Sequence, residues 1–419
     1  MTDLDRVHAA LDNGTLLHPV DPDVPSSVDL AIALGALAGA PQAATSHTRR
    51  ITEYILSGRP APDHVVFVLV DGLGCNLIDA LPADAFLRRH TVAELRPVFP
   101  STTAAALTSI ASAAWPGQHA IPGWFTHLPD LSPPDRGVTA TILPFIERHE
   151  HTSLTELGIT PEMAFPRPSQ LGNLTADVHT HHPEAIAGSV YTAYQRGDDN
   201  GTAGATGESY DSLDEAIDSI TGWVAAAQRP SFHYLYIPDV DAAEHRHGHH
   251  APAVLDAVRA VQAALAQLAQ QLAENRPARS SWRIVASADH GVMTVPDDQK
   301  HRVARGDPLL DDLVVPFSGE PRVPMFHVRA GRAPAFTEQF RERYGDAFAL
   351  LTIDEVERLQ LLGPEPLTDT TRARVGDYVG IAVEPAVLLH EPDGIDTLRG
   401  FHAGLTPDEM RIPLVVVAS

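Results

Sequence analysis

The stretch Val65-Val66-Phe67-Val68-Leu69-Val70-Asp71-Gly72-Leu73-Gly74 carries the strongest structural signal in the chain. Its apolar residues, 65–70, are too continuous for a strand with one solvent-facing side, so they predict a strand buried on both faces. The strand stops at a carboxylate, Asp71, and glycines follow it. Ligands bind at the carboxyl ends of the strands in open parallel α/β sheets, and glycines allow close approach of the backbone. Asp71 is therefore the first candidate for a functional site.

Two further apolar stretches end in the same way. Residues 232–237 lead into Pro238-Asp239-Val240-Asp241, and residues 283–288 lead into Asp289-His290-Gly291. Helical patterns alternate with these strands, most clearly the amphipathic pattern from about Pro252 to Glu274. This alternation predicts an α/β fold with a mostly parallel central sheet that is flanked by helices on both faces.

The 419 residues are enough for one large α/β domain with insertions. We expect residues 1–50 to form an N-terminal extension packed on the core, and residues 51–419 to form a single catalytic domain. Two segments lose the alternation of strands and helices. Residues 125–183, which are rich in Pro, His and Thr, are expected to form a loop or cap, and residues 298–385 a mixed α/β insertion.

Charge and composition exclude several classes of partner. The formal net charge of −24 argues against binding of a nucleic-acid polymer or of an anionic membrane, because both need a basic surface. Lys300 is the only lysine, so a P-loop phosphate site is not expected elsewhere. The first residues do not resemble a signal peptide, and no segment reaches the roughly 20 apolar residues of a membrane span. We expect a cytoplasmic protein; the oligomeric state is not predicted.

The sequence favours a metal site built from histidine and carboxylate ligands. The single cysteine, Cys75, excludes a disulfide framework and a thiolate-rich zinc site. Asp241 and His245 are four residues apart, so one turn of helix places them on the same face. Asp289 and His290 are adjacent at a strand end. Such ligands suit zinc in an open catalytic site, and manganese or another divalent ion could use the same set.

Two further features complete the pattern. His402 lies between Gly400 and Gly404, where a flexible backbone can aim an imidazole at the other ligands. Thr103 ends the segment Pro100-Ser101-Thr102-Thr103, which supplies hydroxyl groups at a strand-to-helix junction, where free amide groups also favour an anion.

Each of these features alone has a simpler interpretation. An aspartate at a strand end more often caps a helix or a turn, and Thr103 could do the same. With 22 histidines in the chain, an Asp-x-x-x-His pair can arise by chance. We expect His247, His249 and His250 to be solvated loop residues. The functional interpretation gains weight because the features occur together and in this order.

At these residues the chain resembles the alkaline phosphatase superfamily, and within it the nucleotide pyrophosphatase/phosphodiesterase branch. Residues 99–103 are similar to the nucleophile motif of that branch, with Thr103 at the attacking position. Residues 238–248 resemble its Asp-x-x-Gly-His-x-x-Gly motif, with Glu244 in place of the usual small residue. Residues 288–291 and 400–404 are similar to the last two ligand motifs.

The resemblance implies a two-metal phosphoesterase that hydrolyses a phosphodiester or pyrophosphate bond in a small, nucleotide-type substrate. Thr103 would attack phosphorus and form a phosphothreonine intermediate, which is then hydrolysed. Two zinc ions would be held by two groups of residues. These are Asp71, Thr103, Asp289 and His290 for one ion, and Asp241, His245 and His402 for the other.

The sequence also departs from the branch. Trp124 stands where many members place an asparagine that contacts a phosphoryl oxygen, and it is either a substrate contact or a core aromatic residue. A sulfatase is excluded, because residues 101–105 lack the Pro-x-Arg that follows a sulfatase nucleophile. Two alternatives stay open: a phosphomonoesterase or phosphomutase of the same superfamily, and a metal-binding or interaction protein that has lost catalysis.

Overall fold

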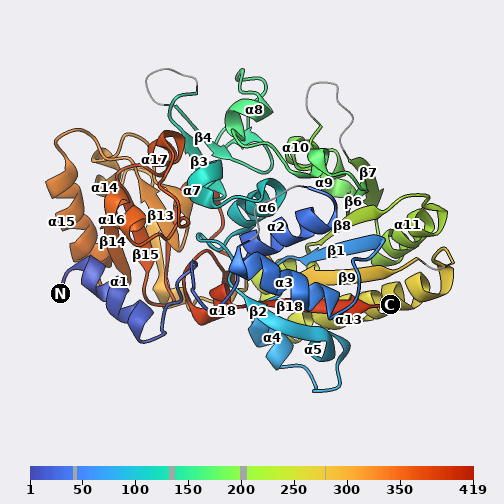
Figure 1. Ribbon diagram of the computed structural model, residues 1–419. Helices are drawn as coiled ribbons and strands as arrows, with labels where there is room; N and C mark the ends of the chain where they lie inside the picture. The colour runs from blue at the N-terminus through green and yellow to red at the C-terminus, as the bar shows by residue number, and fades with distance from the viewer. Residues whose placement is uncertain (41–44, 132–136, 199–204, 279) are drawn as a thin grey trace.

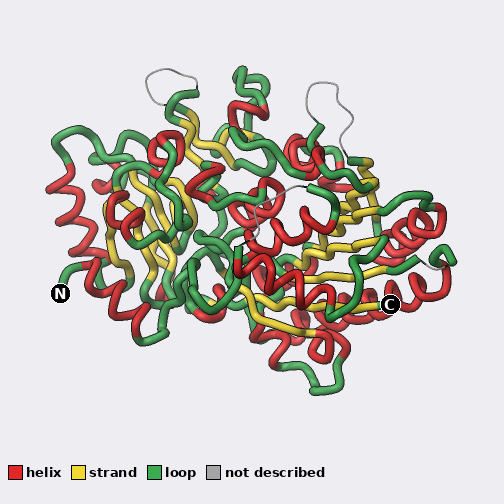
Figure 2. The backbone as a smooth tube through the Cα atoms, in the orientation of Figure 1, coloured by secondary structure: helices red, strands yellow, loops and turns green. Residues whose placement is uncertain are grey.

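The computed structural model describes residues 1–40, 45–131, 137–198, 205–278 and 280–419. Figure 2 shows two separate groups of strands, which correspond to two seven-stranded sheets. The first sheet has the order β2-β18-β9-β1-β8-β6-β7. Its strands are β1 (His64–Val70), β2 (Thr91–Leu95), β6 (Asp177–Pro183), β7 (Thr206–Tyr210), β8 (Ser231–Ile237), β9 (Trp282–Ser287) and β18 (Ile412–Ala418).

The first sheet is mostly parallel. Strands β9, β1, β8, β6 and β7 run in the same direction, and β18 is antiparallel to both of its neighbours. Every residue of β1 is buried, as its uninterrupted apolar sequence predicts. In the register of the central strands, Leu69 pairs with Tyr236 on one side and with Ser287 on the other. These three strands therefore end at the same level.

Helices cover this sheet in two sets. Crossover connections between parallel strands are right-handed. Connections that cross the sheet in the direction from β1 to β6 therefore lie on one face, and connections that cross in the opposite direction, from β7 to β9, lie on the other face. Helices α2 and α6 contact each other, as do α2 and α3, whereas α13 contacts α11, α12 and α5. The predicted fold class is confirmed. The helices are α2 (Ser27–Leu37), α3 (Ser46–Leu56), α4 (Cys75–Asp79), α5 (Phe86–His90), α6 (Thr103–Ser112), α11 (Leu213–Ala226), α12 (Asp239–His247) and α13 (Pro252–Asn275).

The second sheet joins two segments that are far apart in the sequence. It is antiparallel, with the order β14-β15-β13-β12-β3-β4-β5, and lies on the left of Figure 1. Gly319 of β12 pairs with Phe125 of β3, which links the segments. Its strands are β3 (Phe125–Leu128), β4 (Val138–Thr141), β5 (Ile146–Glu147), β12 (Ser318–Glu320), β13 (Val323–Phe326), β14 (Phe348–Thr352) and β15 (Tyr378–Ala382).

The expectation of a loop or cap at residues 125–183 was therefore wrong in its detail. The segment contributes β3, β4 and β5 to the second sheet and β6 to the first; residues 132–136 lie outside the described residues. Strands of four residues or fewer are too short for a clear alternation, and β6 is rich in histidine. The segment 298–385 holds both strands and helices.

Helices beside the second sheet in Figure 1 include α1 (Asp3–Asp12), α15 (Ala333–Tyr344), α16 (Ile353–Arg358) and α17 (Asp369–Val375). In the N-terminal segment, Val7 of α1 packs in the core of this sheet, while Leu30 of α2 packs in the core of the first. Among the described residues, no helix is long and apolar enough to cross a membrane.

The structure also contains shorter helices and strands. They are α7 (Pro116–His119), α8 (Pro161–Ala164), α9 (Glu184–Ala187), α10 (Val190–Arg196), α14 (Pro308–Asp311), α18 (Pro407–Met410), β10 (Met293–Thr294) paired with β17 (Gly400–Phe401), and β11 (Lys300–Val303) paired with β16 (Val387–His390).

Candidate active site

Three neighbouring strands of the first sheet bring three aspartates to one edge. Asp71 follows β1, Asp289 follows β9, and Asp241 lies in the first turn of α12, which begins two residues after β8. The backbone N–H of Asp241 donates to the carbonyl of Asp71 over 3.1 Å, and that of Gly72 donates to Asp289 Oδ1 over 3.1 Å. The three side chains are thus held together by the register of the strands, as the apolar runs and their terminal carboxylates predict.

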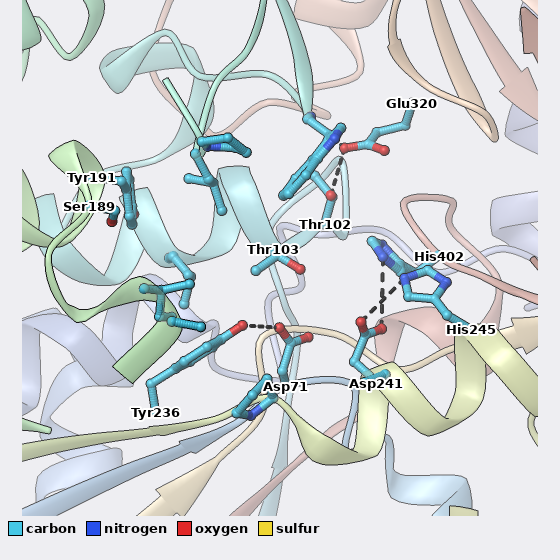
Figure 3. Close-up of a pocket in the computed structure, with 18 of the residues that line it drawn as sticks. Asp71, Thr102, Thr103, Ser189, Tyr191, Tyr236, Asp241, His245, Glu320 and His402 are labelled. Carbon is cyan, nitrogen blue, oxygen red and sulfur yellow. Dashed lines mark hydrogen bonds and ion pairs between the residues drawn. The ribbon is translucent and has the colours of Figure 1, made fainter. Parts of the chain in front are cut away.

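Three histidines lie against these carboxylates. The Nε2 atom of His290 is 3.4 Å from Asp71 Oδ1 and 3.5 Å from Asp289 Oδ2. The Nε2 atom of His245 is 3.2 Å from Asp241 Oδ2, and that of His402 is 4.0 Å from Asp241 Oδ1. The His290 and His402 rings stack with 3.8 Å between their centroids. Figure 3 shows His245 and His402 converging on Asp241.

The opposite nitrogen of each ring faces a backbone carbonyl. The Nδ1 atoms of His245, His290 and His402 lie 2.8, 3.2 and 3.1 Å from the carbonyl oxygens of Gly400, Gly291 and Ser101. A carbonyl only accepts hydrogen bonds, so each Nδ1 carries the proton and each Nε2 presents a lone pair to the carboxylates. This is the arrangement found around metal-ligating histidines.

The donor set fits divalent cations. Asp71 Oδ1, Asp241 Oδ1 and Asp289 Oδ2 are buried and accept no hydrogen bond from the described residues. Burial, with the neighbouring carboxylates, raises the pKa of Asp71 and of Asp241 well above the usual range, and burial raises the pKa of Asp289 to about 7. Burial also lowers the pKa of His290 to about 3. Buried carboxylates beside neutral imidazoles are stable as anions only with positive charge nearby.

The candidate ligand atoms fall into two overlapping groups. Within each group they lie within 4.8 Å of one another, and His290 belongs to both. The groups are Asp71, Asp289 and His290, and Asp241, His290 and His402. His245 lies beside the second group through its contact with Asp241. The structure thus brings all the predicted histidine and aspartate ligands into one cluster.

Thr103 borders the cluster. It is the first residue of α6, its side chain is buried, and its Oγ1 atom lies 3.2 Å from His290 Nε2. The first amide groups of a helix have no partners within the helix, and they attract an anion together with the helix dipole. A hydroxyl group and an anion-binding helix terminus therefore adjoin the carboxylates.

A cavity of about 650 Å³ opens above these residues. Its floor includes Asp71, Thr103 and Asp241, and its walls are largely aromatic and aliphatic. Figure 3 shows Tyr191 and Tyr236 on the side opposite His245 and His402. Trp124 is half-buried and lines this cavity, so its side chain faces the site.

The sequence analysis missed two polar residues of the site. The Tyr236 hydroxyl donates to Asp71 Oδ2, and Glu320 of β12 accepts hydrogen bonds from Thr102 and Trp124. Tyr236 lies next to the end of a predicted strand, and this position could have identified it as a residue of the site. Glu320 comes from the second sheet, and no local pattern distinguishes it.

Glu244, which replaces the usual small residue of the motif, has a hydrogen-bond partner in the structure. Glu244 is fully buried, and its Oε1 atom forms a hydrogen bond with His249 Nδ1 over 2.6 Å. Burial raises the pKa of Glu244 to about 9. His249 is 5% exposed, so the expectation that it is a solvated loop residue was wrong. The chain is crowded here: a Cβ atom at Gly400 would lie 2.5 Å from the Glu244 carbonyl oxygen.

Two features of the structure require glycine at position 72. Its φ angle is +76°, in the left-handed region that other residues rarely adopt, and a Cβ atom would lie 2.9 Å from Asp241 Cα. The absence of a side chain lets α12 approach the end of β1 and places Asp241 beside Asp71.

The mostly parallel sheet, with a hydroxyl group and a cluster of carboxylate and imidazole side chains at its carboxyl edge, defines a protein of the alkaline phosphatase type. The model of the type I phosphodiesterase / nucleotide pyrophosphatase family matches residues 65–402, and the chain belongs to this family. The resemblance predicted from the motifs is confirmed, and the protein is a phosphoester-hydrolysing enzyme.

Solved structures with the same fold include human ectonucleotide pyrophosphatase/phosphodiesterase 5, with 15% sequence identity and a TM-score of 0.62 over 84% of this chain and 87% of the other. An inactive variant of the murine protein in complex with AMP has 16% identity and a TM-score of 0.61 over the same shares. Phosphonoacetate hydrolase from Sinorhizobium meliloti, in complex with phosphonoformate, has 18% identity and a TM-score of 0.58, over 85% of this chain and 90% of that chain. A search of curated protein sequences found no match.

Proposed function

We propose that this enzyme hydrolyses a phosphodiester or pyrophosphate bond in a nucleotide-type substrate, at a two-zinc site with Thr103 as the nucleophile. The observation that carries the proposal is the 3.2 Å contact between Thr103 Oγ1 and His290 Nε2. It lies beside carboxylate oxygens that accept no hydrogen bond from the described residues. The family of the chain and the AMP bound to the murine relative support the substrate class.

Two groups of residues would hold the metals. Bound zinc ions would lower the pKa of a neighbouring hydroxyl group and neutralise charge on the phosphoryl oxygens, and manganese or another divalent ion could do the same. The proposed ligands are Asp71, Thr103, Asp289 and His290 for one ion and Asp241, His245 and His402 for the other.

The reaction follows from the placement of Thr103. Its deprotonated Oγ1 atom attacks phosphorus, and the bond to the leaving oxygen breaks on the opposite side, which leaves a phosphothreonine. Water then attacks the same phosphorus atom, the bond to Thr103 breaks, and Thr103 recovers a proton. The amide groups at the start of α6 face the phosphoryl oxygens in both steps.

Other groups of the chain orient the reacting residues. The Tyr236 hydroxyl group fixes Asp71, and backbone carbonyls hold each histidine in the tautomer that presents Nε2. Trp124, on the cavity wall, offers an aromatic face to the base of a nucleotide.

A comparison of two chromogenic substrates tests the proposal. We expect faster turnover of the nitrophenyl ester of thymidine 5′-monophosphate than of nitrophenyl phosphate. Dialysis against a chelator should abolish the activity and added zinc should restore it. Preference for the monoester would favour the phosphomonoesterase or phosphomutase alternative. Absence of turnover in zinc-loaded protein would favour the non-catalytic alternative, and activity that resists complete metal removal would contradict the two-metal mechanism.

A further inference from the structure

We propose that the cavity selects phosphodiesters whose organic group carries no further negative charge, and that Glu320 is the specificity-determining residue that rejects a second phosphate. The inference rests on the proposed function and narrows its substrate from phosphodiesters and pyrophosphates to phosphodiesters.

Glu320 is anchored next to the nucleophile. It is the last residue of β12, and its Oε1 atom accepts hydrogen bonds from Thr102 Oγ1 and from the backbone N–H of Trp124, both over 2.6 Å. Thr102 immediately precedes Thr103, so the carboxyl group lies on the wall above the reacting hydroxyl (Figure 3). A substrate held by Thr103 therefore occupies a cavity that Glu320 lines.

Among the described residues that line the cavity beside this carboxyl group there is no lysine or arginine. The charge of Arg148 lowers the pKa of Glu320, but Arg148 does not line the cavity. It packs over the ring of Phe125 at 4.0 Å, and its Nε atom donates to Asp393 Oδ1 over 2.8 Å. His182 lines the cavity, but burial lowers its pKa to about 4, so it is uncharged at neutral pH.

The charge of the ligands at the floor has the same sign. Asp71 and Asp241 line the cavity, and the metals proposed above would be largely neutralised by these carboxylates and Asp289. The proposed metals would neutralise the single negative charge of a phosphodiester. A second phosphate on the substrate would enter a cavity that contains a carboxylate and has no lysine or arginine among its described lining residues, where charges are poorly screened.

The remaining walls suit an uncharged organic group. They are formed mainly by aliphatic and aromatic side chains, which gain from contact with apolar surface or with the face of a base. These side chains include Leu107, Phe125, Ile186, Ile395, Leu398 and Phe401.

The test compares one uncharged and one charged leaving partner. Burial raises the pKa of Glu320 to about 7, so assays at pH 8.5 keep it ionised. We expect kcat/KM for the nitrophenyl ester of thymidine 5′-monophosphate to exceed that for ATP by at least 100-fold. In Glu320→Gln, the ratio of kcat/KM for ATP to kcat/KM for the diester should rise at least 10-fold above its value in the unmodified enzyme. Glu365→Gln, at an exposed position, is the matched control and should leave both values unchanged.

The outcomes separate the two proposals. If the zinc-loaded enzyme turns over neither the nitrophenyl diester nor ATP, the proposed function is wrong. If it turns over the diester and ATP equally well, or if Glu320→Gln folds and leaves their ratio unchanged, only the present inference is wrong. The comparison in the unmodified enzyme needs no variant, so it decides the selectivity even if Glu320→Gln fails to fold.

Discussion

His290 Nε2 lies 3.2 Å from Thr103 Oγ1 and 3.4 Å from Asp71 Oδ1, and so links the start of α6 to the end of β1. These residues come from three separate segments of the chain, and the parallel sheet brings them to one edge. The same imidazole belongs to both groups of candidate ligand atoms. The surroundings of the Thr103 hydroxyl group therefore depend on the geometry of the whole cluster.

Replacement of the proposed nucleophile gives the simplest prediction. Thr103→Ala should lower kcat at least 1,000-fold, because no other group replaces the attacking oxygen, whereas Thr103→Ser should retain measurable turnover. Steady-state kinetics with the nitrophenyl diester measure both values, and circular dichroism checks the fold. An alanine variant with undiminished kcat would exclude Thr103 as the nucleophile.

Tyr236→Phe should weaken metal binding and leave the fold intact. The variant removes the hydrogen bond that orients Asp71, and loss of such supporting groups typically costs about 10- to 100-fold in metal affinity or activity. Competition with a zinc chelator measures the affinity. Tyr378→Phe, in the second sheet, is the control and should match the unmodified protein. Equal affinities in both variants would show that Tyr236 does not position Asp71.

Gly400→Ala should disturb the ligands on either side of β17. The new Cβ atom would lie 2.5 Å from the Glu244 carbonyl oxygen, so α12 or the His402 segment must shift. A shift of about 1 Å at a catalytic group can cost about 100-fold in rate. Gly222→Ala is the matched control, because nothing lies within 4 Å of its Cβ position in α11. Kinetics that do not distinguish the two variants would contradict the proposed crowding.

Buried histidines of the first sheet should make the protein less stable in acid. Burial lowers the pKa of His181 to about 3 and that of His233 well below its usual range. The unfolded chain protonates these rings below about pH 6.5, whereas the folded chain keeps them neutral. Their contribution is complete above about pH 6.5 and is lost as the pH falls, by about 1.4 kcal/mol per group and pH unit.

The variant His181→Leu tests this coupling. Between pH 6 and pH 4.5, the free energy of unfolding should fall less steeply with decreasing pH in this variant than in the unmodified protein. The difference in slope should correspond to nearly one proton fewer taken up on unfolding. The exposed His8→Gln should keep the original slope. Urea unfolding at each pH provides the measurement, and equal slopes in all three proteins would exclude the buried histidines as the cause.

The sequence was most informative where structure is local. Strands β1, β8 and β9 follow from their apolar runs, and the carboxylates after them follow from the known location of ligand sites in parallel sheets. Helix α13 agrees with its predicted bounds to within a residue. Each of these features depends on neighbours in the sequence, so composition and spacing are sufficient to predict it.

The missed features depend on contacts between distant segments. The two halves of the second sheet are joined where Gly319 pairs with Phe125. Strands of three or four residues are too short to show a pattern in the sequence that would predict such pairing. Strand β6 contains buried histidines, which in sequence are typical of a polar loop. Glu320 reaches the site only through the second sheet, so its role could be inferred only from the structure.

The stereochemical course at phosphorus tests the central claim most directly. A chiral phosphorothioate diester hydrolysed in isotopically labelled water reports whether the reaction has one displacement or two. Attack by Thr103 followed by attack of water gives two in-line displacements, so we predict net retention of configuration. Net inversion would mean that water attacks the substrate directly, and it would contradict the phosphothreonine intermediate at Thr103.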